Sequence, residues 1–243
     1  QACNNDVGLG EPWKCNVAQT YGDPLVANFS WACENAAPTA PGALAKDEII
    51  INLHREELNY NKARNKAGIE VLKFFHNNGI KTLGLFRIVK KHGLAILKEL
   101  KKQGIKGLFL QGGEIIYEYD DKLKLHERSG NTDDIKKALT EDGYNIILAS
   151  QVLDEGVDID LFQAGVLFTG GKSAIKITQQ VGRVSRAKKD TENIAIIIDF
   201  DDSNINQIFN RQTKERKKAI TNTGAIQLKD IRELVDLVNK IKN

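Results

Sequence analysis

The stretch AGVLFTGGKSAIKITQQVGRVSR, residues 164–186, joins an apolar run to a helical pattern through two glycines. The apolar run predicts a strand over 165–170, because a short run bounded by glycine is typical of a buried strand. The remainder predicts a helix over 173–189, since its apolar residues recur at helical spacing. A strand that leads through glycines into a helix is a building unit of an α/β fold.

The Gly-Gly-Lys-Ser sequence within this stretch raises the question of a phosphate-binding loop. Such a loop has the pattern G-x-x-x-x-G-K-[ST], and its first glycine makes the tight turn around the phosphates. That position is occupied by Val166, inside the predicted strand. A second near match, DVGLGEPWK at 6–14, has Glu11 where the lysine should stand. We therefore expect that the chain is not a stand-alone P-loop kinase or NTPase.

The second half of the stretch places three polar side chains at helical spacing. Gln179, Arg183 and Arg186 are spaced i, i+4 and i+7, so they share one face of the predicted helix. Gly182 beside them lets another backbone approach. Two guanidinium groups suit an anionic ligand, because arginine is always charged and grips phosphate oxygens through paired hydrogen bonds. An exposed basic helix with salt bridges gives the same pattern, so the spacing alone leaves both interpretations open.

Outward from this stretch, strands alternate with helices, which predicts βαβ units and a mainly parallel sheet. The run at 193–200 is continuously apolar, which is typical of a strand buried on both faces. The helical pattern at the C-terminus is expected to pack on its own domain. Strands are predicted over 48–53, 80–86, 105–112, 144–150, 165–170 and 193–200, and helices over 61–79, 90–104, 132–143, 173–189 and 226–243.

Composition describes an ordinary soluble globular protein, with 41% hydrophobic and 28% charged residues. No apolar run reaches the roughly 20 residues that cross a bilayer, and no signal peptide is visible, so we expect a cytoplasmic protein and no membrane partner. The net charge of +3 is compatible with a nucleic-acid partner without requiring one. The sequence contains no methionine, which favours a fragment or a sequence from which methionine was lost.

Composition changes near residue 45, and the three cysteines all precede that point. Cys3, Cys15 and Cys33 form no CxxC pair and have no histidine nearby, so no metal site is expected. We divide the chain into an irregular N-terminal segment over 1–45, which can be the remnant of a preceding domain, a main domain over 46–204, and a C-terminal helical extension over 205–243.

The segment IILASQVLDEGVDID, residues 146–160, precedes the arginine helix by one strand. ASQVLDEGVDID resembles motif V, and QQVGRVSR resembles motif VI, of the second, RecA-like motor domain of superfamily 2 helicases and translocases. LGLFRIVKKHG (83–93) is similar to that family's motif IV region, and the resemblance covers roughly residues 42–220. Its style is closest to phage-type DNA helicases, which favours DNA over RNA as the partner and the nucleoid or infected-host cytoplasm as the location. Ser150 stands where the family more usually has threonine.

The resemblance implies a RecA-like three-layer domain and a set of site residues. Arg183 and Arg186 would reach ATP phosphates across a cleft, one of them as an arginine finger. Beside the nucleotide would lie Gln179, Gly156 and Asp158. The residues that would bind the nucleic-acid backbone are Arg87, His92, Ser150 and Gln151. Lys172 and Ser173 would bind it from an anion-binding helix N-terminus. ATP and Mg²⁺ would be bound mainly by a first RecA-like domain of the same native protein, whose Walker A and Walker B motifs these residues lack.

Two functions remain open at this point. The chain is either the C-terminal lobe of an ATP-dependent helicase, inactive alone, or a non-catalytic module that binds nucleic acid or protein and derives from a motor domain. Intact Arg183 and Arg186 favour the first, because a module without a nucleotide has little use for them. Residues 114–130 are an insertion that can form a small hairpin, and no function follows from its sequence.

Overall fold

The computed structural model of the chain describes residues 58–86, 90–112, 114–150, 161–171, 173–184, 194–228 and 230–242. Its centre is a seven-stranded sheet in the order β4-β3-β2-β5-β1-β6-β7. Strands β2, β5, β1, β6 and β7 are parallel, and β3 and β4 extend the sheet as an antiparallel hairpin. The strands are β1 (Thr82–Phe86), β2 (Gly107–Gln111), β3 (Ile115–Tyr119), β4 (Leu125–Ser129), β5 (Ile146–Ser150), β6 (Ala164–Leu167) and β7 (Ile196–Asp199).

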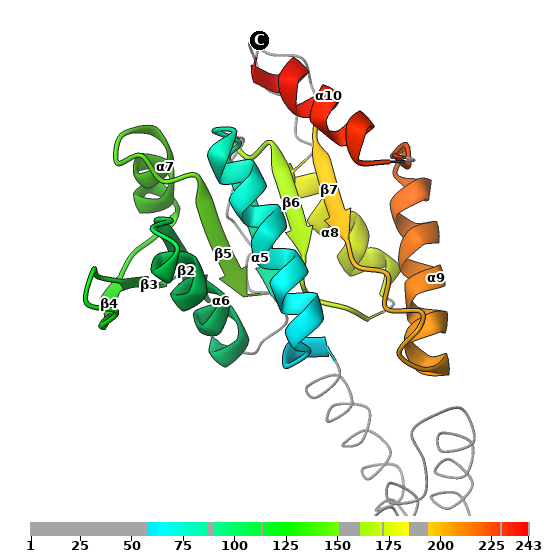
Figure 1. Ribbon diagram of the computed structural model, residues 1–243, viewed down its shortest axis with the longest axis horizontal. Coiled ribbons are helices and arrows are strands. Elements are labelled where there is room, and N and C mark those ends of the chain that lie inside the picture. Colours follow the sequence, from blue (N-terminus) through cyan, green and yellow to red (C-terminus); the bar gives the residue numbers. More distant parts are fainter. Residues whose placement is uncertain are drawn as a thin grey trace, which may run out of the picture.

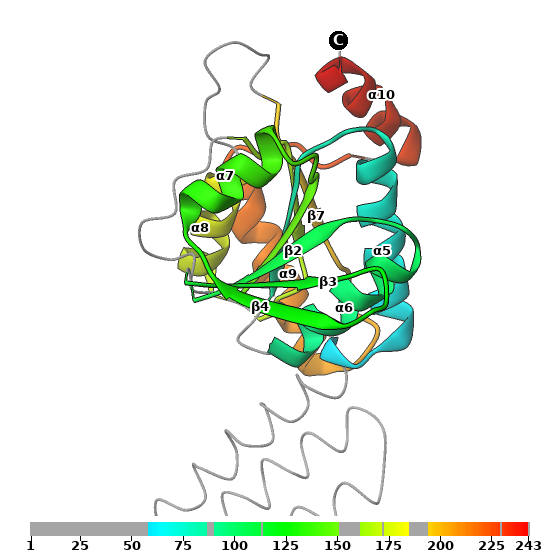
Figure 2. The ribbon, with the colours of Figure 1, turned by 90° about the vertical axis from the view of Figure 1, so that its left-hand side faces the viewer.

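Helices cover both faces of the sheet, so the domain has three layers (Figures 1 and 2). One core cluster joins α5, α6 and α10 to the first face, and another joins α7 and α8 to the second, where α9 packs beside α8. The helices are α5 (Lys62–Asn77), α6 (Lys90–Lys102), α7 (Thr132–Thr140), α8 (Ala174–Val184), α9 (Gln207–Asn222) and α10 (Ile231–Lys242). The mainly parallel, three-layer α/β architecture expected from the sequence is confirmed.

Local sequence explains where the helices begin and end. Asn61 caps the start of α5, because its side chain accepts a hydrogen bond from the Arg64 backbone. Gly79 and Gly104, with φ of 70° and 77°, adopt the left-handed conformation just after α5 and α6. Asn131 begins α7 with a capping box that Asp134 completes. These ends fix each helix against the strand that follows it.

Strand β7 departs from the sequence-based expectation. Its apolar run predicts burial on both faces, yet within the described residues β7 is the edge strand next to β6, and only Ile196 of its four residues is fully buried. An apolar run indicates that its side chains are shielded from water. It does not indicate whether a neighbouring strand or a helix covers them. The expected strand at 48–53 lies outside the described residues.

The insertion at 114–130 forms the hairpin of β3 and β4, as the sequence allowed. Every residue of β4 is exposed, and its charged side chains keep this open edge soluble. The C-terminal helix α10 packs on its own domain, because Leu234 and Val238 join the first core cluster. None of the described helices is both long enough and apolar enough to cross a bilayer.

Candidate functional site

The parallel strands bring the candidate site to one edge of the sheet. Strands β1, β5, β6 and β7 end at Phe86, Ser150, Leu167 and Asp199, and their register places these ends side by side. Ligands of open α/β sheets bind at this carboxyl edge, particularly where neighbouring strands send their helices to opposite faces. Here α6 follows β1 on one face and α8 follows β6 on the other.

Several predicted site residues lie outside the described residues. They are Arg87, Gln151, Gly156, Asp158, Lys172 and Arg186. Arg183 is described as part of α8, without its side chain. The roles given to these residues therefore stay predictions.

The Thr-Gly-Gly-Lys-Ser segment is not a phosphate loop. Val166, at the position of the loop's first glycine, lies within β6, is fully buried, and pairs in register with Gly84 and Ile198. The two consecutive glycines of this segment have another role. Gly170 and Gly171 adopt φ of 61° and 90°, which lets the chain turn from β6 toward α8.

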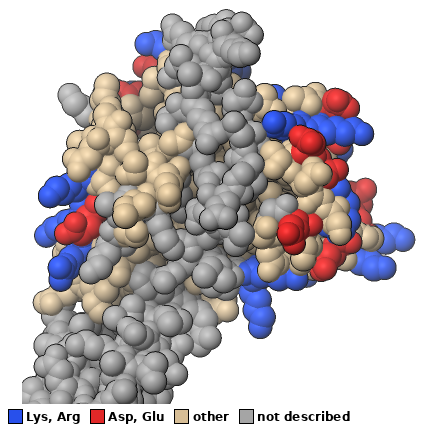
Figure 3. Space-filling view, turned by 180° about the vertical axis from the view of Figure 1, so that it is seen from behind, with Lys and Arg blue, Asp and Glu red and all other residues tan. Residues whose placement is uncertain are grey.

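Helix α8 has an exposed side with four uncharged residues. Ile175, Thr178, Gln179 and Gly182 are all exposed, and a Cβ atom added to Gly182 would meet no atom within 4 Å. Arg183 lies one turn after Gln179 in a continuous helix, so the two positions share a side. In Figure 3, which shows this face of the molecule, uncharged residues cover much of the described surface beside the basic margin over α9. A helix side with an exposed isoleucine and a bare glycine is suited to contact with another protein surface.

Two residues expected to touch nucleic acid are buried instead. His92 is 2% exposed and Ser150 is 4% exposed. His92 lies in the first turns of α6, where its ring makes T-shaped contacts with the rings of Phe86 and Phe168 at centroid distances of 4.9 Å and 5.9 Å. Ser150 ends β5 and His92 lies in the helix that follows β1, so both lie near the carboxyl edge, but the sequence does not tell which way each side chain points. Direct contact with a nucleic acid does not fit this placement, whereas Ser173, at the start of α8 and given the same role, is exposed.

Aromatic rings fill the point where the helices diverge. Phe86 at the end of β1 and Phe168 after β6 stack with centroids 4.5 Å apart, and the ring of Phe200 lies 5.4 Å from that of Phe168. His92 closes the stack from α6. The described part of this edge, between α6 and the strand ends, is therefore packed with aromatic rings.

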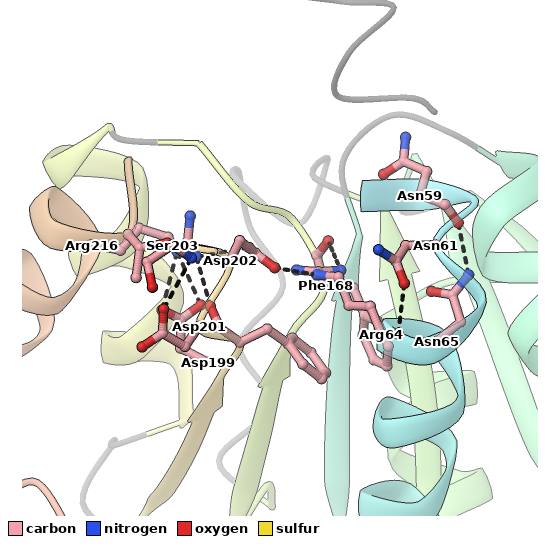
Figure 4. A network of polar contacts seen from close by, with 12 residues as sticks. Asn59, Asn61, Arg64, Asn65, Phe168, Asp199, Asp201, Asp202, Ser203 and Arg216 are labelled. Carbon is pink, nitrogen blue, oxygen red and sulfur yellow. Dashed lines mark hydrogen bonds and ion pairs between the residues drawn. The ribbon is translucent and has the colours of Figure 1, made fainter. Parts of the chain in front are cut away.

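Behind these rings lies a buried cluster of charges that the sequence did not reveal (Figure 4). Arg216 of α9 is fully buried, and its Nε donates to both carboxylate oxygens of Asp199 at 3.0 Å and 3.1 Å. Its Nη2 donates to Asp202 at 2.9 Å, and Arg64 of α5 donates to the other oxygen of Asp202 at 2.9 Å. The only hint in the sequence is the acidic DFDD that ends the apolar run at 199–202.

Burial sets the electrostatics of this cluster. It raises the pKa of Asp199 and lowers the pKa of Arg64 from their ordinary values, and the ion pairs with Arg216 and Asp202 oppose these shifts. The buried carboxylates of Asp199 and Asp202 are thus neutralised by guanidinium groups inside the domain. They do not fit a Mg²⁺ site, and no group of three His, Cys, Asp or Glu side chains within the described ranges could hold a metal.

A pH prediction follows from His92. Its Nε2 hydrogen bonds to Asn65 Oδ1 at 2.8 Å, and burial, aided by the nearby Arg64, lowers the pKa of His92 from 6.5 to about 3. Between these values the unfolded chain binds a proton that the folded chain does not, so stability falls as pH falls through this window. We expect His92 to account for about 2 kcal/mol lost between pH 7 and pH 5.

The measurement is urea denaturation at both pH values for the wild type and His92→Gln, whose amide can still donate to Asn65. The variant should lose about 2 kcal/mol less than the wild type over this interval. Equal losses in the two proteins would mean that His92 is not held neutral by its surroundings.

A groove of about 460 Å³ lies elsewhere, along the outer edge of β7 between α9 and α10. Its walls are largely aliphatic, including Ile198, Leu228 and Leu234. Its acidic members Asp199, Asp201 and Asp230 are paired with Arg216, Lys217 and Arg232, respectively. The groove thus does not bring the predicted site residues together.

Comparison with curated proteins finds one similar sequence, which is named as a helicase. The sequence is 32% identical over 96 residues to "Putative helicase 22" of Sulfolobus islandicus filamentous virus. The matched stretch amounts to 40% of this chain and 16% of the viral protein, so the chain spans a small part of the length of that relative. No family model matches the sequence.

Solved structures similar to the chain include helicase C-terminal domains. The C-terminal domain of S. cerevisiae Dbp5, bound to Gle1 and IP6, is 16% identical with a TM-score of 0.46, and the match covers 73% of this chain and 93% of that one. T4 UvsW is 24% identical with a TM-score of 0.48, and the match covers 73% of this chain and 37% of UvsW.

Proposed function

We propose that this chain is the second motor lobe of an ATP-dependent nucleic-acid helicase or translocase. The observation that carries the proposal is α8, a continuous helix at the carboxyl edge that exposes Gln179 and Gly182 and places Arg183 one turn after Gln179. The order of motifs around it and the partial likeness to a viral helicase-named protein support the same function.

In this function the lobe completes a nucleotide site rather than building one. ATP, bound with Mg²⁺ on a first lobe of the native protein, supplies the phosphoryl group whose transfer to water drives movement. Arg183 and Arg186 stabilise the charge that develops on the transferred group, because a guanidinium from across an interface meets it in a site that excludes water. Gln179 hydrogen bonds beside them, and Gly156 and Asp158 lie near the ribose.

The properties of the described surface agree with a shared site. Phe86 and Phe168 stack where the connections from β1 and β6 diverge, and the carboxylates of Asp199 and Asp202 are already paired with arginines. Nothing in the described part of the chain therefore replaces a first lobe as the holder of phosphates and metal. The bare glycine and exposed Ile175 on α8 suit the approach of that lobe.

Contact with nucleic acid is assigned to residues that follow the strand ends and to the start of α8. Arg87, Gln151, Lys172 and Ser173 would bind the phosphate backbone, which fixes position without reading sequence and so permits movement along a strand. His92 and Ser150, being buried, would support these contacts from behind. We propose DNA rather than RNA as the partner.

The experiment compares ATP hydrolysis by this chain alone with hydrolysis by the native protein that contains it, each with single-stranded DNA, double-stranded DNA or RNA. We expect negligible hydrolysis by the chain alone and hydrolysis by the native protein that DNA stimulates more than RNA. Robust turnover by the chain alone would refute the proposal. Nucleic-acid binding by the native protein without any hydrolysis would favour the non-catalytic module instead.

A further inference from the structure

The loop from β6 to α8 is held at both ends by buried arginines. Arg64 Nη1 donates to the Phe168 carbonyl at 3.2 Å, and Arg216 Nη1 donates to the Gly171 carbonyl at 3.2 Å. Between these two carbonyls the chain passes through Gly170 and Gly171, which have no side chains to hold the path of the loop. The two guanidinium groups supply the restraint that the glycines lack.

We propose that Arg64, Asp202 and Arg216 are positioning residues that fix this loop and, through it, the start of α8. Asp202 is the bridge, because its two carboxylate oxygens accept from Arg64 Nε and Arg216 Nη2, each at 2.9 Å. The bridge joins α5 on one face of the sheet to α9 on the other (Figures 1 and 4).

Burial makes these restraints strong. The side chains of Arg64, Asp202 and Arg216 are only 4%, 3% and 1% exposed, so water does not screen their attraction. Arg216 is further fixed by Asp199, by the Phe200 carbonyl at 2.8 Å and by Thr213 Oγ1 at 3.3 Å. Arg64 packs against the Phe200 ring, with its guanidinium carbon 4.4 Å from the ring centroid. A guanidinium held by this many partners can hold a backbone carbonyl in one place.

The consequence for hydrolysis rests on the proposed function. Helix α8 begins directly after the loop, and the Ser173 carbonyl accepts a hydrogen bond from the Ile177 amide at 3.0 Å in its first turn. We therefore expect a shift of the Gly171 carbonyl to move α8, and with it Gln179 and Arg183. A guanidinium misplaced by about 1 Å from its ligand loses much of its effect on turnover.

The test is hydrogen exchange of this 243-residue chain, measured by mass spectrometry, in Asp202→Asn and in the matched control Asp201→Asn. The first substitution keeps the side-chain volume but presents an N–H to one of the two arginines, whereas Asp201 is exposed and pairs with Lys217. The informative peptides contain the amides of Phe168 and Ile177, which donate to Leu85 and Ser173 on either side of the loop.

We expect these peptides to exchange about 10- to 100-fold faster in Asp202→Asn, the factor implied by losing a charged hydrogen bond. Peptides of β2 and the Asp201→Asn control should match the wild type. Unchanged exchange at both flanking amides, or acceleration that is equal across the sheet, would overturn the positioning role. If Asp202→Asn does not fold, Thr213→Val removes a single acceptor of Arg216 and should give the same local pattern at smaller amplitude.

Hydrolysis by the native protein separates the two proposals. With the proposed function correct, Asp202→Asn should lower kcat for ATP hydrolysis roughly tenfold while KM and nucleic-acid affinity stay near wild type. Local acceleration of exchange with unchanged kcat would leave the positioning of the loop standing and count against the role assigned to α8.

Discussion

In the native protein, Arg183→Ala is expected to reduce nucleic-acid-stimulated ATP hydrolysis by about 10³-fold or more, the value of an arginine that meets the transferred phosphoryl group. Affinity for single-stranded DNA should stay within a few-fold of wild type, because backbone contacts are assigned to other residues. Steady-state hydrolysis and fluorescence anisotropy measure the two quantities separately. Arg186→Ala should behave in the same way, since the second arginine lies on the same predicted helix face.

The matched control is Arg211→Ala. Arg211 is an exposed arginine on α9, so its loss removes the same charge from the same lobe without touching α8. Hydrolysis by this variant should equal that of the wild type. Wild-type rates in both Arg183→Ala and Arg186→Ala would remove the arginine-finger assignment, whereas a loss in Arg211→Ala of similar size would show a general effect of positive charge.

The second large effect is expected on stability. Arg216→Ala should lower the free energy of unfolding by about 3–5 kcal/mol, because it leaves the carboxylates of Asp199 and Asp202 buried without their main partner. It also removes the donor to the Gly171 and Phe200 carbonyls. Urea denaturation of this chain at neutral pH measures the loss.

Lys217→Ala is the control for that measurement. Lys217 follows Arg216 in α9 and also pairs with an aspartate, Asp201, but both side chains are about half exposed. An exposed ion pair is worth about 0–1 kcal/mol, since water and salt screen it. A loss below about 1 kcal/mol in Arg216→Ala as well would mean that the buried cluster contributes little to the fold.

Most helices and strands could be predicted from the spacing of apolar residues and from the glycines that end the helices. The helices at 61–79 and 90–104 appear as α5 and α6, because each ends at a glycine that adopts positive φ. The strands at 80–86 and 144–150 appear as β1 and β5, which are buried along their whole length and so have mostly apolar sequences.

Helix α9 shows what periodicity misses. Its buried side includes Gln212, Thr213 and Arg216, so the helix has no apolar stripe that a pattern could find. These residues are buried because the cluster around Asp199 and Asp202 gives them partners. Such partners come from distant parts of the sequence and are set by the fold, and therefore only the structure reveals them.

The sequence predicted where in the fold the candidate site lies better than it predicted which side chains are exposed there. Residues that follow parallel strands must gather at the carboxyl edge, so the sequence places Ser150 and the 168–173 segment there. The direction of each side chain depends on packing, which buries His92 against two phenylalanines and leaves Gln179 exposed.

The central claim is that α8 faces a triphosphate held by another lobe. Its most direct measurement is a structure of the native protein with single-stranded DNA and a non-hydrolysable ATP analogue. We expect a guanidinium nitrogen of Arg183 or Arg186 within about 3 Å of a γ-phosphate oxygen, with the phosphates bound by a different lobe. Both guanidinium groups paired with carboxylates of their own lobe, with the analogue remote from α8, would contradict it.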